Sequence, residues 1–357
     1  MLKDSTILIR NIFHMLCYAF KILRQQNYQD IETEEFTHVE DMLAAILSRG
    51  INQQLKQGLY RDYISVEEQS KTLRGKVNPL ETRLLQMRRL RQFDCIHDEF
   101  SPDVEFKQIL KATCVLVLRS KEIRKKQKDE IRRIVPFFSS VSDIDLSMIQ
   151  WGRLQYHRNN RSYEMLMNIC YMIWQSLLPS VDKGKTKFSL FDEESLPRLY
   201  EKFILEYYRQ HFPMLHASDK RIQWDIPEET DQSMIKLLPG MHSDITLRHK
   251  GKTLIIDAKF YKHSLATFME KRMIHSANLY QIFTYVKNED KTMSGNVSGL
   301  LLYARTTEEI EPHLSVVIGG NQISVQTLDL NRPFKDISMA LDNIPINTFN
   351  DELQKIS

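Results

Sequence analysis

Apolar residues recur at helical spacing through much of the first half of the chain, with polar residues between them. A repeat of three to four residues is the signature of an amphipathic helix whose apolar face packs on a core. The stretch 121–133 shows this clearly, because Ile123 and Ile131 fall on one face and charged residues on the other. The pattern predicts helices at 9–23, 39–47, 106–118, 121–133 and 165–178.

One segment of this first half is extended rather than helical. Between Tyr60 and Val77 the helical repeat is lost, and residues 73–77 are typical of a strand around a turn or bulge at Gly75. We therefore predict a mostly helical N-terminal domain with a small β insert, and we place its boundary at residue 158, before a polar stretch at 180–187.

The order of predicted elements changes in the second half. Ser195 can cap a helix, three strands follow, a second amphipathic helix starts at Ser276, and residues 299–304 are continuously apolar. Such a run is typical of a strand buried on both faces, and strand, helix, buried strand predicts a parallel crossover unit. The fold class is α/β, with a mixed sheet flanked by helices over 159–357. The three strands are predicted at 221–226, 243–248 and 253–260.

Composition limits the number of domains and the class of protein. A chain of 357 residues with 42% hydrophobic and 27% charged residues is ordinary for a globular protein of two domains. The start lacks the pattern of a secretion signal, and the apolar stretch 7–23 is interrupted by charged and polar residues. The four cysteines have no paired spacing, so we expect no zinc site or disulfide framework and a cytoplasmic location.

The net charge of +3 permits contact with nucleic acid without arguing for it. Two segments, 83–91 and 121–133, are locally basic. We interpret the second as the solvated face of a helix.

The chemistry is carried by a predicted hairpin. If its turn is centred on residues 250 and 251, Ile245 opposes Ile256 and Leu247 opposes Leu254, which places these four apolar residues on one face. On the other face Asp244 then opposes Asp257. Lys259 lies two residues after Asp257, so strand alternation adds it to the same patch.

Two opposed carboxylates destabilise a strand pair unless a positive charge lies between them. Mg²⁺ is a natural occupant, since it binds one or two carboxylates together with water and substrate phosphate. An ion held by Asp244 and Asp257 can polarise a phosphodiester, and Lys259 can orient the attacking water or offset charge in the transition state. The alternative is a set of opposed charges on a solvated sheet face.

These residues resemble a known motif. Residues 239–245 and 254–261 are similar to the PD-(D/E)xK nuclease motif, here in the form Asp…Asp-x-Lys, and more closely to the McrC family of nuclease subunits of McrBC modification-dependent restriction systems. The likeness runs nearly from end to end. It includes Ile9-Arg10-Asn11-Ile12, Arg74-Gly75-Lys76, residues 103–111 and Asn278-Leu279-Tyr280-Gln281.

The resemblance implies that Asp244, Asp257 and Lys259 are catalytic and that the substrate is double-stranded DNA carrying modified cytosine. It also implies a partner, an McrB-like AAA+ GTPase, on which the N-terminal domain (1–158) docks while 159–357 forms the endonuclease. Glu201 can approach the metal, although an exposed helical glutamate needs no such role.

Gln281 and Tyr285 are four residues apart, on the helix face that we predict to point away from the apolar stripe. In related nucleases a Gln-x-x-x-Tyr helix lies beside the active site. The alternative is an ordinary polar helix face.

The sequence contains no phosphate-binding loop motif of the kind that binds GTP or ATP. Gly184-Lys185 and Gly251-Lys252 are each followed by threonine, but a phosphate-binding loop needs a glycine five residues earlier, where Pro179 and Thr246 stand. Any nucleotide is therefore expected to bind the partner. Two other functions remain open, a non-catalytic regulator of a partner NTPase and a stand-alone DNA repair nuclease, although the weak basic charge argues against the latter.

Overall fold

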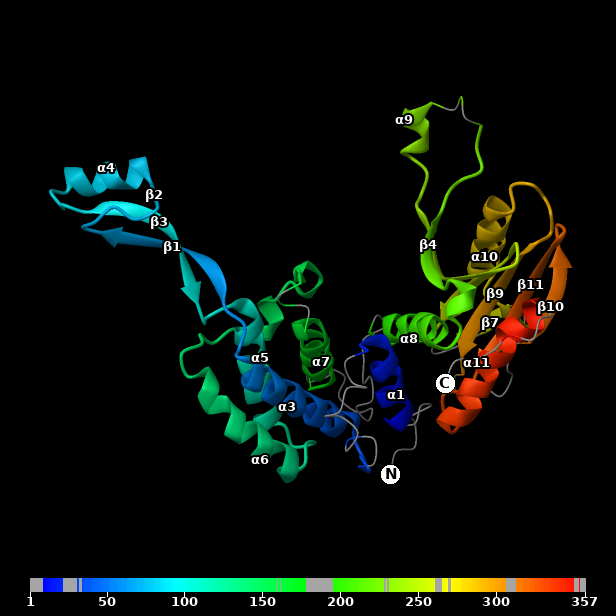
Figure 1. The fold of residues 1–357 in the computed structure, drawn as a ribbon, viewed down its shortest axis with the longest axis horizontal. Coiled ribbons are helices and arrows are strands. Elements are labelled where there is room, and N and C mark those ends of the chain that lie inside the picture. The colour runs from blue at the N-terminus through cyan, green and yellow to red at the C-terminus, as the bar shows by residue number, and fades with distance from the viewer. Residues whose placement is uncertain are drawn as a thin grey trace. The chain divides into compact units, whose positions relative to one another are not determined.

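The computed structural model of the protein describes residues 9–21, 31, 34–158, 160, 162–177, 195–227, 229, 231–260, 265–268, 271–305, 313–349 and 353. The glycine-lysine pair at 184–185 and the polar stretch 180–187 lie outside these residues. The chain forms two compact units, one of residues 33–185 and one of residues 1–32 together with 186–357 (Figure 1).

The unit of residues 33–185 is built around four helices, α3 (Val39–Gln57), α5 (Glu105–Arg119), α6 (Lys125–Ile134) and α7 (Ser162–Leu177). Their apolar stripes meet in a core, so the predicted helices at 39–47, 106–118 and 165–178 are confirmed. Ile123 and Ile131 are buried as predicted, although α6 begins only at Lys125. Three short 3-10 helices, Val135–Phe138, Leu146–Met148 and Trp151–Arg153, complete the unit.

The β insert of this unit is larger than predicted. Strands β1 (Asp62–Ser70), β2 (Lys76–Val77) and β3 (Phe93–Ser101) form an antiparallel sheet in the order β1-β3-β2, and α4 (Pro79–Met87) connects β2 to β3. Neither α4 nor β3 was predicted from the sequence, and only two residues of the predicted strand at 73–77, Lys76 and Val77, pair with another strand. Gly75 has a φ of +60°, and a Cβ there would collide with the Ile96 carbonyl oxygen, so this turn requires glycine.

The second unit contains a six-stranded mixed sheet in the order β10-β11-β9-β6-β5-β4. Its strands are β4 (Ser218–Ile222), β5 (Met241–His249), β6 (Lys252–Lys259), β9 (Val297–Ala304), β10 (Leu314–Ile318) and β11 (Asn321–Leu328). β6, β9 and β11 run parallel to one another, which confirms the crossover unit. The predicted strand at 221–226 ends at Ile222, and β10 and β11 were not anticipated.

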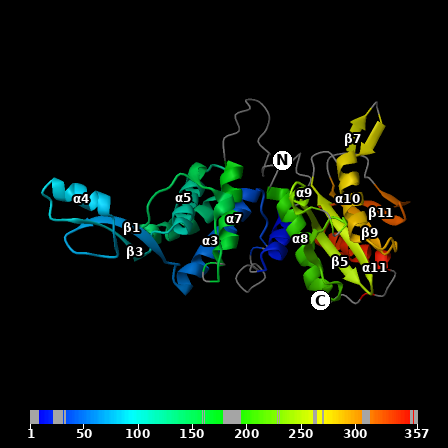
Figure 2. The same ribbon diagram turned by 90° about the horizontal axis from the view of Figure 1, so that it is seen from above.

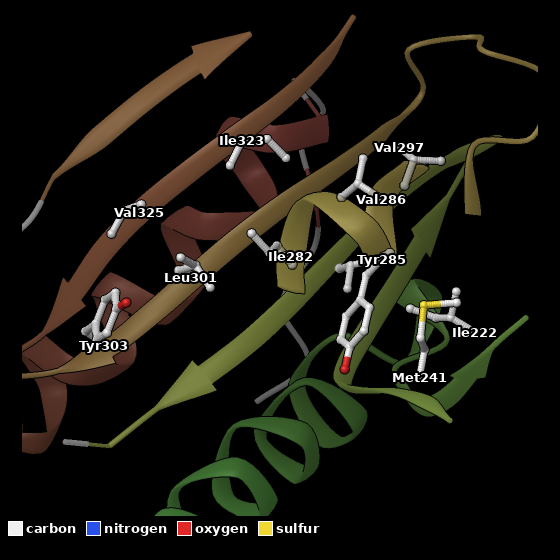
Figure 3. Close-up of a cluster of buried hydrophobic side chains, with 11 residues drawn as sticks. Ile222, Met241, Ile282, Tyr285, Val286, Val297, Leu301, Tyr303, Ile323 and Val325 are labelled. Carbon is white, nitrogen blue, oxygen red and sulfur yellow. The ribbon is translucent and has the colours of Figure 1, made fainter. Parts of the chain in front are cut away.

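Helices cover this sheet. α10 (Ser276–Glu289) places Ile282, Tyr285 and Val286 on one face of β9 and β6, and α11 (Phe334–Phe349) lies on the opposite face (Figure 3). α8 (Ser195–His211) packs against β5 and β6 and contacts α11, where Tyr208 OH donates to the Leu341 carbonyl oxygen at 2.9 Å. A short helix α9 (Gln232–Ile235) lies between β4 and β5. A two-stranded hairpin of β7 (Leu265–Phe268) and β8 (Lys271–Ile274) extends away from the sheet (Figure 2).

The first helix, α1 (Ile9–Ala19), belongs to this second unit although it opens the chain. It packs against α8, and Tyr18 OH lies 2.8 Å from His211 Nε2. Asn11 Nδ2 donates to the Leu330 carbonyl oxygen at 2.7 Å. The two units are therefore separated in the sequence at 32/33 and 185/186, whereas we predicted a single boundary at 158. No local sequence pattern reveals that α1 packs on a helix some 190 residues later.

Candidate active site

The hairpin register predicted from the sequence is present in the structure. β5 and β6 pair antiparallel with Ile245 opposite Ile256, Leu247 opposite Leu254 and His249 opposite Lys252. Lys250 and Gly251 have φ angles of +46° and +79°, as a two-residue type I′ turn requires. The turn thus fixes which side chains share a face at the other end of the hairpin.

At that other end the two strands separate. The regular pairing of β5 with β6 ends at Ile245 and Ile256. On its other edge β5 forms a bulge against β4. Between two successive pairs, Ser218 with Thr246 and Lys220 with Ser243, β5 has two residues, Asp244 and Ile245, and β4 has only Asp219. Such a bulge re-aims a side chain. Asp244 Oδ2 accepts a hydrogen bond from the Ala258 backbone N–H at 2.8 Å, so its carboxylate reaches across the opening toward β6.

Asp257 lies on β6, an inner strand of the sheet between β5 and β9, and is fully buried. Lys259 Nζ lies 2.7 Å from Asp257 Oδ2, and the lysine side chain is only 15% exposed. The Lys259 ammonium offsets the charge at Asp257 Oδ2, whereas Oδ1 accepts no hydrogen bond from a donor group of a described residue. A buried carboxylate with an unsatisfied oxygen is costly, which favours a site that binds something positively charged.

The electrostatics of the site agree with this geometry. Burial raises the pKa of Asp244 to about 7, and the negative charges of Asp257 and Glu201 add to the effect while the Ala258 N–H and Lys259 oppose it. Burial also raises the pKa of Asp257, against the opposing effect of Lys259. The two carboxylates cannot both ionise at low cost without another positive charge, and perturbed pKa values of this kind gather at functional sites.

Glu201 lies on α8 and is electrostatically coupled to the site. Burial raises the pKa of Glu201, and the charges of Lys259, Asp257 and Arg198 modify it. The residue is thus not the fully exposed helical glutamate of the alternative interpretation. Its part in metal binding stays a prediction.

Gln281 and Tyr285 contact each other, since Gln281 Nε2 donates to Tyr285 OH at 2.9 Å. The expectation that both face away from the apolar stripe is wrong for Tyr285, which is 8% exposed and belongs to the buried cluster with Ile282 and Val286 (Figure 3). This cluster lies on the face of β6 that carries Ile255, hence on the face of Asp257 and Lys259. The face of β6 that carries the candidate site is therefore packed against α10.

Two groups beside the candidate site, the Ala258 N–H and the Asn278 side chain, were not predicted from the sequence to have a role. The Ala258 N–H was missed because a backbone donor leaves no signal in residue type. Asn278 Nδ2 donates to Tyr303 OH at 2.8 Å, and Tyr303 is the β9 partner of Lys259. Its position three residues before Gln281, on the same face of α10, was a signal available in the sequence.

The residues present fit a divalent ion of the magnesium type. Within the described part of the chain no group of three or more His, Cys, Asp or Glu side chains gathers as a metal cage. Two carboxylates, one of them with an unsatisfied buried oxygen, match an ion that takes one or two protein carboxylates and completes its shell with water and phosphate oxygens.

Residues 3–304 match the family model described as the McrBC 5-methylcytosine restriction system component. The chain belongs to this family. It is also 27% identical to the Escherichia coli (strain K12) protein named type IV methyl-directed restriction enzyme EcoKMcrBC, over 96% of this chain and 98% of that protein. The resemblance to the McrC family inferred from the motif residues is confirmed.

Two solved structures share a distant likeness with this McrBC family member. One is a half-complex of Thermococcus gammatolerans McrB AAA+ hexamers with bound McrC, at 15% identity and a TM-score of 0.47 over 94% of this chain and 76% of that chain. The other is the T. gammatolerans McrBC complex, at 16% identity and a TM-score of 0.39 over 56% of each chain.

Proposed function

We propose that this chain is the Mg²⁺-dependent endonuclease subunit of a modification-dependent restriction system. The observation that carries the proposal is the convergence of Asp244, Asp257 and Lys259 at the opened end of a hairpin, in a chain of the McrBC family. A scaffold that only stimulates a partner has no need for two buried carboxylates whose repulsion costs stability.

Each residue has a chemical task in this proposal. Asp244 and Asp257 would hold the ion, which supplies Lewis-acid polarisation of the phosphodiester and acidifies a water molecule. The Ala258 N–H fixes the direction of the Asp244 carboxylate, so the ligand pair is arranged before the ion arrives. Lys259, held at 2.7 Å from Asp257, keeps an ammonium beside the reacting phosphate and stabilises the negative charge that grows there.

The substrate and the partner follow from the family. The E. coli relative is named a methyl-directed restriction enzyme, and the family model names 5-methylcytosine, so we propose DNA with modified cytosine as the substrate. The chain lacks the glycine spacing of a phosphate-binding loop, so we propose that an McrB-like AAA+ GTPase supplies the nucleotide-driven step.

The test uses the full chain, a methylated and an unmethylated plasmid, and an McrB-like AAA+ protein from the same organism. Cleavage of the methylated plasmid alone, requiring Mg²⁺, nucleotide and both proteins, is expected. Nucleotide hydrolysis stimulated by the chain, with no cleavage under any condition, would instead identify the regulator, and efficient cleavage without the partner would identify the repair nuclease.

A further inference from the structure

Tyr303 lies beside Lys259 in the sheet. The two residues are register partners on the parallel strands β9 and β6, so their Cα atoms are about 4.8 Å apart and their side chains leave the same face. Tyr303 is fully buried and belongs to the cluster between β9 and α10 (Figure 3). The direction of this aromatic side chain therefore limits the space that is open to the lysine.

The hydroxyl of Tyr303 is bound by α10. Asn278 Nδ2 donates to it at 2.8 Å, and Asn278, in the first turn of the helix, is itself only 5% exposed. Stability does not require a polar pair in a largely apolar cluster, because replacing both partners by apolar groups of similar shape is often neutral. The hydrogen bond does give the Tyr303 side chain a fixed direction.

The helix that carries Asn278 is held close to the sheet at Gly299. A Cβ at this position of β9 would lie 2.8 Å from Ile282 Cγ1 and 2.9 Å from Val286 Cγ2, both on α10. Glycine thus permits an approach that a larger residue would prevent. The close contact at Gly299 places the middle of α10, and the bond from Asn278 ties its first turn to Tyr303.

We propose that Tyr303, anchored by Asn278, is a positioning residue that keeps the Lys259 ammonium beside Asp257. The inference rests on the proposed function for the task of Lys259 at the reacting phosphate. Lysine has a flexible four-carbon stem, so the ion pair at 2.7 Å to Asp257 fixes its end and leaves its path open. A fixed ring beside the stem removes other rotamers, and a displacement of about 1 Å in an active site can lower a rate about 100-fold.

The first test uses Tyr303→Phe, which keeps the ring and removes the anchoring hydrogen bond, in the complex with the AAA+ partner. We expect the cleavage rate at saturating DNA to fall about tenfold while KM for DNA is unchanged, because the pair acts on the reacting group and not on DNA binding. The matched control is Tyr280→Phe, at a tyrosine of α10 that is 67% exposed, and it should change neither quantity. A wild-type rate in Tyr303→Phe, or an equal loss in the control, would overturn the inference.

Asn278→Leu breaks the same hydrogen bond from the other side. Tyr303→Phe, Asn278→Leu and the double variant should all lose the cleavage rate by the same factor, because two groups that act through one bond are not additive. Losses that multiply in the double variant would show that the residues act separately, which contradicts an anchored pair.

Acetylation of lysines followed by mass spectrometry reports on Lys259 without any cleavage. With the full chain in EDTA, Lys259, whose side chain is 15% exposed, should react severalfold faster in Tyr303→Phe than in the wild type. The exposed Lys335 of α11 should react equally in both. Unchanged acetylation of Lys259 in the variant would show that the pair only supports the fold, and would overturn the inference. Faster acetylation in a protein whose complex cuts no DNA would support the positioning of Lys259 and refute the proposed function separately.

Discussion

Asp244 Oδ2 accepts a hydrogen bond from the Ala258 backbone N–H at 2.8 Å, at the point where β5 no longer pairs with β6. The carboxylate takes the place of a main-chain acceptor and bridges the opening between the strands. This bond presents Asp244 next to Asp257, whose side chain comes from the following strand. The candidate site therefore forms where the β5–β6 backbone hydrogen bonds end, and the Asp244 side chain accepts the next hydrogen bond from β6.

Loss of the ammonium or of the central carboxylate should abolish cleavage. Asp257→Asn and Lys259→Ala are each expected to reduce the cleavage rate by about 10³-fold or more, because each group acts on charge at the reacting phosphate. Their stabilities should differ. Lys259→Ala leaves the buried Asp257 carboxyl without its cation and should lower the melting temperature, whereas Asp257→Asn removes a costly charge. Plasmid cleavage and thermal melting of both variants provide the measurement.

Lys335→Ala is the control for these variants, since it removes an exposed lysine far from the site in sequence and should leave both readouts unchanged. Cleavage at the wild-type rate by either site variant would contradict the assignment of the active site.

The hairpin register could be predicted from residue types, and the details of the site could not. A two-residue turn and the need to place Ile245, Ile256, Leu247 and Leu254 on one face determine the pairing. The bulge at Asp244 depends on how β4 pairs on the other edge, which no local pattern of β5 records. Tyr285 was predicted on the helix face away from the apolar stripe, yet it belongs to the buried cluster that includes Ile255, and its hydroxyl accepts a hydrogen bond from Gln281.

A buried aspartate remote from the carboxylates should govern part of the acid stability of the unit that contains the six-stranded sheet. Asp290 is 3% exposed, and burial raises its pKa, but hydrogen bonds from Ser294, Gly295 and Asn321 together outweigh burial and lower the pKa to about 2. A depressed folded-state pKa stabilises the fold above the unfolded value near 3.9, and the contribution is lost as the pH falls toward 2. The shift corresponds to about 2 kcal/mol.

Asp290→Asn is therefore expected to destabilise the protein by about 2 kcal/mol at pH 7, and by much less at pH 2.5. Urea unfolding at both pH values measures the difference, with Asp336→Asn, an exposed aspartate of α11, as the control. A deficit that stays constant between the two pH values would show that lost packing, not the charge, is responsible.

Removal of residues 1–32 should unfold the unit that contains the six-stranded sheet, although the candidate active site lies more than 200 residues away in sequence. α1 buries Ile12, Phe13, Met15, Leu16 and Tyr18 at 4% exposure or less. Five such side chains contribute on the order of 10 kcal/mol, comparable with the whole stability of a domain. The truncated chain 33–357 is expected to be insoluble or to lack a cooperative melting transition. A folded, active truncation would show that α1 is dispensable.

The unit of residues 33–185 should carry the docking of the AAA+ partner. A fragment of residues 33–185 is expected to co-purify with the partner, and a fragment that joins 1–32 to 186–357 through a flexible linker is expected to fail. The linker is needed because 186–357 alone would expose the surface that α1 covers. Binding carried only by the joined fragment would contradict this division of function.

Mg²⁺ should stabilise the protein through Asp244 and Asp257, and Ca²⁺ should support DNA binding without cleavage. Without an ion, two buried carboxylates repel each other and only Lys259 offsets them, so an ion that binds only the folded form raises the melting temperature. Asp244→Asn should be more stable than the wild type in EDTA, because it removes the repulsion, and should gain less from Mg²⁺, because an amide is a poorer ligand. Calorimetry in EDTA and then in excess Mg²⁺ measures both effects, with Asp336→Asn as a charge-matched control. Equal Mg²⁺-induced shifts in the wild type and Asp244→Asn would place the ion elsewhere in the molecule.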